Sequence, residues 1–214
     1  MRLRAEFPAL YPILDASCLA AAEDRPAFLR RLVESLAAVG IGILQYRNKT
    51  GDEAEILADA RVMRAVAREQ MVLILNDWPE LALSAGFDGV HVGQTDLSPD
   101  EARGIMGPAK FIGVSTHNEA QLRAADSQPV DYIAIGPVFA TTTKQNPDPV
   151  VGFEGVRMAR SLTQKTLVAI GGITLENAAI VRRAGADSVA VISAIFCSGE
   201  DPAKSAGDFV RAMQ

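Results

Sequence analysis

Three threonines and a lysine follow directly after a strongly apolar segment of the chain. The apolar run Tyr132–Ile135 leads into Gly136–Lys144, which contains Thr141, Thr143 and Lys144. Packing gains nothing from hydroxyl groups and an ammonium, whereas an anionic phosphate would gain several hydrogen bonds and a positive charge from them. The segment therefore predicts a phosphate site, with a polar surface loop as the alternative.

A second group of candidate ligands ends an earlier apolar run. Here Gln45, Arg47 and Lys49 alternate with Tyr46 and Asn48. Alternate side chains of a strand share one face, so an amide, a guanidinium and an ammonium converge on the same side. Such cations need a counter-charge. A diphosphate ligand is favoured, and internal salt bridges are the alternative.

Two aspartates occupy equivalent places after the next two apolar runs. Asp77 follows Asn76, and Asp96 lies in the segment Gly93-Gln94-Thr95-Asp96. Adjacent strands lie about 4.8 Å apart, so the two carboxylates could approach one cation. Mg²⁺ is usually held by one or two carboxylates together with substrate phosphate oxygens. The alternative is that each aspartate caps the helix that follows it.

Small polar residues and glycine end the remaining runs. Gly172 belongs to a glycine pair, and Ile192-Ser193 ends the last run. Backbone N–H groups in such turns point at bound anions, and this is the usual phosphate site of a parallel barrel. Ser115 precedes His117, which is either a base or a helix-start histidine bonded to backbone. Zinc is not expected, because neither His91 nor His117 has a ligand partner at a suitable spacing.

The anion-binding residues thus form two groups, one after the second to fourth runs and one after the sixth to eighth. A single phosphate would not need both groups. The sequence therefore suggests two phosphorylated substrates that meet in one site, with Lys144 and Ser115 able to serve either.

Short β-rich runs alternate with helical patterns along the whole sequence. The predicted strands are Pro12–Asp15, Ile41–Arg47, Val72–Asn76, Gly89–Val92, Phe111–Ser115, Tyr132–Gly136, Leu167–Gly171 and Ser188–Ser193. The predicted helices are Pro26–Val39, Asp52–Arg68, Pro79–Ser84, Pro99–Met106, Glu119–Ala125, Glu154–Leu162, Leu175–Arg183 and Pro202–Met213. This alternation predicts an α/β fold, a single-domain (β/α)8 TIM barrel over residues 1–214 with its active site at the C-terminal strand ends. An open doubly wound sheet is the alternative.

Composition narrows the classes of partner and compartment. The 214 residues carry a net charge of −5, which argues against nucleic acid as a partner. No apolar run approaches the roughly 20 residues that span a bilayer, so no membrane partner is expected. Cys18 and Cys197 lie far apart in no metal or redox spacing, which predicts two free thiols in a reducing cytoplasm. The sequence leaves a homo-oligomeric state open.

Taken together, these motifs resemble the thiamine phosphate synthase family from about Tyr11 to the C-terminal helix. Gln45-Tyr46-Arg47-Asn48-Lys49 is similar to the family's Gln-x-Arg-Glu-Lys segment, with Asn48 in place of the glutamate. The other matching segments, in family order, are Asn76-Asp77, Gly89–Asp96, Gly113–His117, Gly136-Pro137 with Thr141-x-Thr143-Lys144, Gly171–Thr174 and Val191–Ser193. Ala140 stands where proline is frequent.

The resemblance implies that 4-amino-2-methyl-5-hydroxymethylpyrimidine diphosphate is joined to a thiazole phosphate, or to its carboxylated form, giving thiamine phosphate and diphosphate. It assigns the pyrimidine diphosphate to Gln45, Arg47, Lys49, Asn76, Ser115 and Lys144, of which Arg47, Lys49 and Lys144 neutralise the leaving group. It assigns Mg²⁺ to Asp77 and Asp96. It assigns the thiazole phosphate to Thr141, Thr143, Gly172, Ile192 and Ser193. The Pro-rich segment Gln145–Val151 is a hypothetical lid.

Three other functions remain as alternatives. A thiazole tautomerase of the same fold would use His117 as a base but would not need the diphosphate-binding residues. A non-catalytic barrel would only bind thiamine intermediates, and would not need to keep Asp77, Asp96 or Lys144. A sugar phosphate isomerase or lyase would explain Gly172 and Ser193 but not the second anion-binding group.

Overall fold

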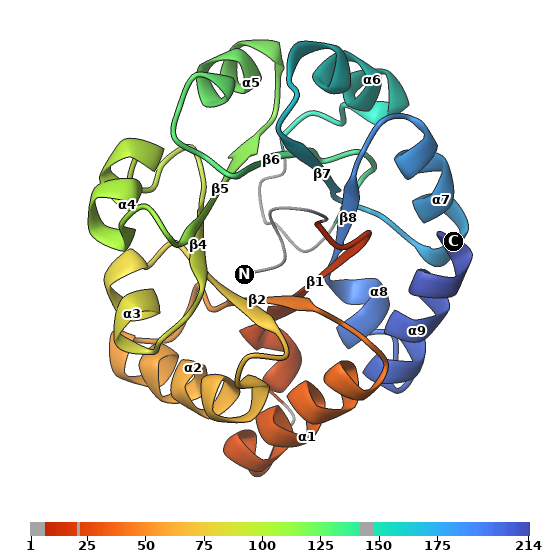
Figure 1. The fold of residues 1–214 in the computed structure, drawn as a ribbon. Coiled ribbons are helices and arrows are strands. Elements are labelled where there is room, and N and C mark those ends of the chain that lie inside the picture. The colour runs from red at the N-terminus through yellow and green to blue at the C-terminus, as the bar shows by residue number, and fades with distance from the viewer. Residues whose placement is uncertain (1–6, 21, 142–147) are drawn as a thin grey trace.

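Eight parallel strands close into a barrel in the order in which they occur in the chain (Figure 1). The computed structural model describes residues 7–20, 22–141 and 148–214. The strands are β1 (Leu10–Asp15), β2 (Ile43–Arg47), β3 (Val72–Asn76), β4 (Gly89–Val92), β5 (Phe111–Thr116), β6 (Tyr132–Ile135), β7 (Thr166–Ile170) and β8 (Ser188–Val191). Pairing of β1 with β8 closes the ring, so the predicted TIM barrel is confirmed and the open sheet is wrong.

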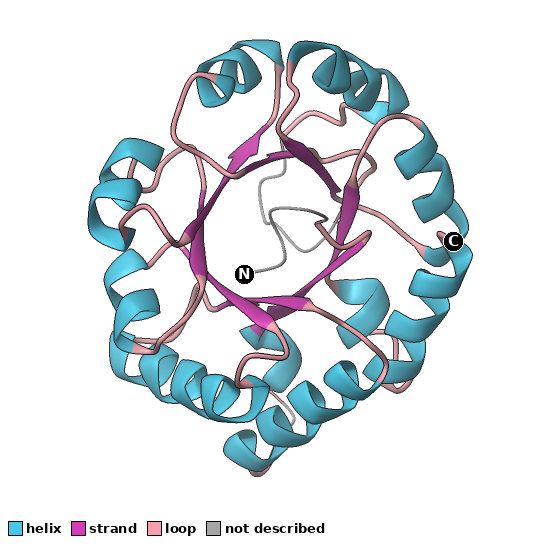
Figure 2. Cartoon of the chain, in the orientation of Figure 1, coloured by secondary structure: helices cyan, strands magenta, loops and turns pink. Residues whose placement is uncertain are grey.

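Helices surround the strands on the outside (Figure 2). They are η1 (a 3₁₀ helix, Ala16–Leu19), α1 (Arg25–Ala38), α2 (Glu53–Ala67), α3 (Pro79–Ser84), α4 (Pro99–Met106), α5 (Glu119–Asp126), α6 (Gly152–Leu162), α7 (Leu175–Arg183), α8 (Ser193–Phe196) and α9 (Pro202–Ala212). The predicted α3, α4 and α7 agree with the structure at both ends. The short η1 and α8 have no counterpart in the prediction, because four residues are too few to show a helical period. The last strand consequently ends at Val191, and Ser193 begins α8.

Local signals fix where the helices start and stop. Ser98 caps α4 through a reciprocal pair of bonds with Glu101, and Pro99 occupies the first turn, where a missing N–H costs little. Gly185 follows α7 with φ +124°, a conformation that residues with a Cβ rarely adopt. These caps turn each chain segment back toward the next strand.

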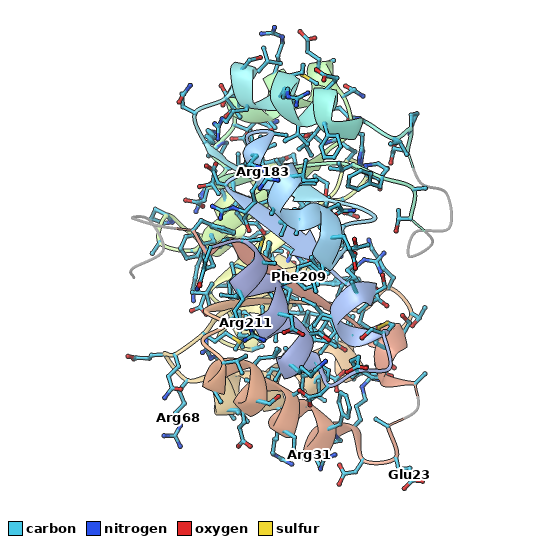
Figure 3. The ribbon with its side chains drawn as sticks, turned by 90° about the vertical axis from the view of Figure 1, so that its right-hand side faces the viewer. Glu23, Arg31, Arg68, Arg183, Phe209 and Arg211 are labelled. Atoms are coloured by element: carbon cyan, nitrogen blue, oxygen red, sulfur yellow. A yellow bond between two sulfur atoms is a disulfide. The ribbon has the colours of Figure 1, made fainter. Side chains whose placement is uncertain are left out.

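The apolar side chains form two layers. The larger layer packs the helices onto the outside of the barrel. On α9, for example, Phe209 is 2% exposed whereas Arg211 lies at the surface (Figure 3). The smaller layer fills the barrel interior and consists of Tyr11, Ile13, Ile43, Ile74, Tyr132, Ala134, Val168 and Ala190. Within the described ranges, no helix has both the length and the apolar character needed to cross a membrane.

The two cysteines are paired, so the prediction of two free thiols is wrong. Cys18 and Cys197 form a disulfide with their Cα atoms 6.0 Å apart, although 179 positions separate them in sequence. Cys18 lies in η1 just after β1, and Cys197 follows α8 just after β8. Because β1 and β8 are neighbours in the closed barrel, the fold brings the first and last units together. Sequence spacing carries no trace of this proximity.

Candidate active site

The candidate ligands that the structure describes all face one cavity at the C-terminal ends of the strands. Its volume is about 370 Å³. Its lining includes eleven of the predicted site residues, namely Gln45, Arg47, Lys49, Asn76, Asp77, Asp96, Ser115, Thr141, Gly172, Ile192 and Ser193. Thr143 and Lys144 lie outside the described residues, as does the 145–147 part of the hypothetical lid.

The end of β2 sends alternate side chains to opposite sides, as predicted. Arg47 lines the cavity and forms an ion pair with Asp15 at the end of β1. Tyr46 and Asn48 face the helices instead, where Asn48 Nδ2 donates to Glu55 at 2.8 Å. Burial works to raise the pKa of Asp15, but bonds from Ser17 and the charge of Arg47 hold it below its ordinary value. The Arg47 guanidinium is thus fixed at the cavity wall by a carboxylate that stays ionised.

Lys49 lies between the two aspartates. Its ammonium bonds to Asp77 and lies 4.0 Å from Asp96 Oδ1. Burial raises the pKa of Asp77 to about 6, against the opposing effect of Lys49. Burial would also raise the pKa of Asp96, but its interactions with Asp77, Gly93 and Lys49 lower it. The two carboxylates therefore converge on a single positive charge.

Neither aspartate caps a helix, so that alternative is wrong. The N-cap position of α3 is Trp78, without a side-chain bond, and α4 is capped by Ser98. Asp96 instead accepts a hydrogen bond from the Gly93 N–H at 2.7 Å. Asp77 has φ +70°, in the left-handed region that side chains with a Cβ disfavour. Strained backbone of this kind clusters at functional sites, where the surrounding structure supports it.

The hard oxygen donors in the cavity suit a magnesium ion bound jointly with substrate. Among the described residues, no group of three or more histidine, cysteine, aspartate or glutamate side chains is placed to hold a metal alone. Mg²⁺ commonly takes one or two carboxylates and completes its shell with water and phosphate oxygens. Beside the aspartates, the buried Asn76 Nδ2 has no hydrogen-bond partner among the described residues. A buried donor left unpaired is costly, which fits a ligand acceptor at this point.

The opposite side of the cavity is built from backbone. Gly172 has φ +63°, and a Cβ there would lie 2.5 Å from the Ala140 carbonyl oxygen. Only glycine therefore lets the turn after β7 approach the segment that leads to Thr141. Ile192 and Ser193 begin α8 directly beyond β8. Exposed N–H groups in such tight turns are the part of a barrel that receives a phosphate.

His117 lies just before α5, lines the cavity and is bonded to backbone. Its Nδ1 lies 2.6 Å from the Gly136 carbonyl oxygen, so this nitrogen carries the proton and donates. Its Nε2 lies 3.4 Å from Asp148, in the described end of the segment that follows β6. The predicted backbone bond of a helix-start histidine is therefore confirmed, and the role of His117 as a base stays a prediction.

Sequence reasoning missed the floor of the cavity. Tyr11, Tyr132 and His91 are buried there and hydrogen-bonded to one another and to Ser115. Alternation along β1 and β6 does place Tyr11 and Tyr132 on the inward face with Ile13 and Ala134. A buried tyrosine on that face needs a hydroxyl partner, which was the available signal.

Fold and site together define a TIM-barrel enzyme whose cavity has basic side chains and two aspartates on one side and backbone turns on the other. A sequence model for the family described as thiamine monophosphate synthase matches residues 10–195. The thiamine-phosphate synthase of Koribacter versatilis is 50% identical over 208 residues, which cover 97% of each chain. That of Vibrio campbellii is 39% identical over 87% of this chain and 91% of its own. The chain belongs to the thiamine monophosphate synthase family.

Solved structures agree with this assignment. A thiamine phosphate pyrophosphorylase from Pyrococcus furiosus superposes with a TM-score of 0.83 at 27% identity, covering 99% of this chain and 97% of that one. A 3-hexulose-6-phosphate synthase shares the fold alone, at 15% identity and a TM-score of 0.65. These findings support the synthase over both the tautomerase based on His117 and the non-catalytic barrel.

Proposed function

We propose that this chain joins the pyrimidine diphosphate to the thiazole phosphate, with release of diphosphate. The observation that carries the proposal is the single cavity with two anion-binding sides: basic side chains and two aspartates on β2–β4, and backbone turns after β7 and β8. A one-phosphate reaction would leave one of these sides without a purpose. Family membership supports the same substrates.

The metal assignment follows from the donor set. Asp77 and Asp96 would hold Mg²⁺, since both carboxylates already surround one positive charge. When bound, the ion supplies Lewis-acid stabilisation of the charge that develops on the leaving diphosphate. The positions of Asp77 and Asp96 would put that charge at the β3–β4 side of the cavity.

The chain's own cations would drive departure of the diphosphate. Arg47, Lys49 and Lys144 neutralise its oxygens, and the bond between the pyrimidine methylene carbon and the diphosphate oxygen breaks with both electrons on oxygen. The pyrimidinylmethyl cation that remains is delocalised by the ring amino group. The thiazole nitrogen then donates its lone pair to the methylene carbon, which forms the new C–N bond.

The thiazole phosphate would be anchored on the opposite side by Thr141, Thr143, Gly172, Ile192 and Ser193. Anchoring holds the thiazole nitrogen near the methylene carbon before the cation forms, so capture competes well with water. The Gln145–Val151 lid, the cytoplasmic location and a homo-oligomeric state stay predictions.

The proposed function is tested by incubating the purified protein with both substrates and Mg²⁺, with and without EDTA. We expect equimolar thiamine phosphate and diphosphate, and loss of both products when EDTA removes the metal. Binding of both substrates without product would contradict the proposal and indicate a binding protein. Product that persists in EDTA would contradict the metal assignment alone.

The thiazole side of the cavity can be probed at Gly172. Gly172→Ala should raise the KM for thiazole phosphate by about 10-fold or more, because a methyl group would push the turn from the Ala140 carbonyl and spoil backbone contacts with phosphate. Gly107→Ala is the matched control: its φ is +76°, but no atom lies within 4 Å of the added Cβ. Steady-state kinetics in each substrate give the answer. A change only in the KM for pyrimidine diphosphate would overturn the phosphate assignment.

A further inference from the structure

A continuous row of hydrogen bonds crosses the floor of the cavity from β2 to β5. Gln45 Nε2 donates to the Tyr11 hydroxyl at 2.9 Å, and Tyr11 and Tyr132 hydroxyls are 2.9 Å apart. The Tyr132 hydroxyl lies 3.0 Å from His91 Nδ1, and His91 Nε2 lies 2.8 Å from Ser115 Oγ. Gln45, Tyr11, Tyr132 and His91 are each buried, with at most 8% exposed. Both ends of the row line the cavity.

A glycine on β5 leaves the space that the Tyr132 ring of this row occupies. A Cβ on Gly113 would lie 2.0 Å from the Tyr132 ring, so β5 uses glycine to let that ring cross it. Gly113 and Ser115 are alternate residues on the inward face of β5. Their strand thus provides both the space for Tyr132 and the far end of the row. Phe7 packs against both tyrosine rings from the side, with centroids 5.7 and 5.2 Å away.

Each hydroxyl in the row has one proton, and this sets which group donates in each hydrogen bond. Tyr11 accepts from Gln45, so its only proton goes to Tyr132, whose own proton must then go to His91 Nδ1. Because His91 Nδ1 accepts this proton, the proton of the imidazole ring itself lies on Nε2. Burial raises the pKa of both tyrosines above the ordinary value, which keeps them protonated. His91 Nε2–H therefore donates to Ser115.

Because the donors and acceptors are fixed along the row, one end of the row offers a hydrogen-bond donor to the cavity and the other end offers an acceptor. Ser115 Oγ accepts from His91, so its own proton is free to donate into the cavity. The Gln45 amide nitrogen donates to Tyr11, so the carbonyl oxygen of the same amide is the group that accepts a hydrogen bond from a substrate. An anionic oxygen suits the first end, and an amino group suits the second. If every hydrogen bond in the row were reversed, Ser115 would donate to His91 and would present only a lone pair to the anion. Binding of an anion therefore disfavours the reversed arrangement.

We propose that Tyr11, Tyr132 and His91 are positioning residues that polarise the cavity for a substrate with an amino group at one end and a diphosphate at the other. The inference rests on the proposed function, since the pyrimidine diphosphate carries both groups. In this proposal neither tyrosine acts on the reacting atoms. They act by holding Gln45 as an acceptor and, through His91, Ser115 as a donor.

Steady-state kinetics of a variant without the Tyr132 hydroxyl test whether the row positions Gln45 and Ser115. Tyr132→Phe should lower kcat/KM for the pyrimidine diphosphate about 10- to 100-fold, because Ser115 and His91 lose their fixed orientation. The KM for thiazole phosphate should stay within about twofold of wild type. Tyr46→Phe is the matched control, since Tyr46 is equally buried and hydrogen-bonded but faces the helices. It should cost stability without changing the balance between substrates.

The protonated nitrogen of His91 is a second readout that needs no turnover. The chain has two histidines, so ¹⁵N-histidine protein gives two ring systems, and His117→Asn assigns them. With inorganic diphosphate and Mg²⁺ bound, NMR should show His91 protonated on Nε2, and Tyr132→Phe should disturb that state. A proton on Nδ1, unchanged kinetics in Tyr132→Phe, or equal effects of the Tyr132 and Tyr46 variants would overturn the proposal. Failure of the wild type to form thiamine phosphate would instead overturn the proposed function. The NMR result would still show whether His91 carries its proton on Nε2, as the row of hydrogen bonds requires.

Discussion

Asp77→Asn is expected to lower the rate of thiamine phosphate formation by about 10²-fold or more. Asn keeps the size of the side chain but removes one of the two negative charges that surround the Lys49 ammonium. The remaining carboxylate, Asp96, should hold Mg²⁺ more weakly, so the variant should need more metal to reach its maximal rate. Initial rates at saturating substrates, measured across a range of Mg²⁺ concentrations, check both effects.

A matched substitution separates the site from general effects of charge. Asp208 lies on α9, where it pairs with Arg211 on the outside of the barrel. Asp208→Asn makes the same chemical change and should leave the rate and the metal requirement unaltered. A near wild-type rate in Asp77→Asn at every Mg²⁺ concentration would remove Asp77 from the metal site.

Loss of Arg47 should have a comparable or larger effect. Arg47→Met is expected to cost about 10²- to 10³-fold in kcat, the range seen when one preorganised donor to developing negative charge is deleted. The Asp15 partner holds this guanidinium at the cavity wall before substrate arrives. Arg47→Lys keeps the charge without the planar fork, so it should recover only part of the rate. Single-turnover measurement of diphosphate release would separate this step from binding.

The control for Arg47 lies on the outer surface. Arg123 pairs with Glu119 at 2.8 Å within α5, away from the cavity. Arg123→Met should leave diphosphate release unaffected. If Arg47→Met raised only the KM for thiazole phosphate, the assignment of Arg47 to the diphosphate would be wrong.

Most of the fold could be predicted because its signals are local. Prolines at helix starts, capping residues such as Ser98 and apolar runs of strand length act within a few positions of the chain. The structure agrees with the predicted β3 and β4 at both ends, and each of the other strands differs by one or two residues at one end or both. What local signals could not show is contact between distant residues. The disulfide between Cys18 and Cys197 depends on barrel closure.

The candidate site divides in the same way. Gln45, Arg47 and Lys49 could be grouped from alternation on one strand, and the structure places them along one cavity. Asp15 was missed because its role depends on pairing with Arg47 across two strands. The row through Tyr11, Tyr132 and His91 was missed because five strands contribute to it. Hydrogen bonds between strands are a property of register, which a single sequence does not display.

The disulfide has a topological consequence. Because it joins the first and last strand units, the polypeptide between Cys18 and Cys197 becomes a covalent ring that contains β2–β8 and α1–α8. Closing a loop of this length in the unfolded chain removes conformational freedom equivalent to roughly 5 kcal/mol in the chain-entropy treatment. A single proteolytic cut in any surface loop of the ring would leave one covalent molecule that separates only on reduction. Scission between any helix and the next strand within the ring would add two new chain ends while the disulfide still held the first and last strand units together.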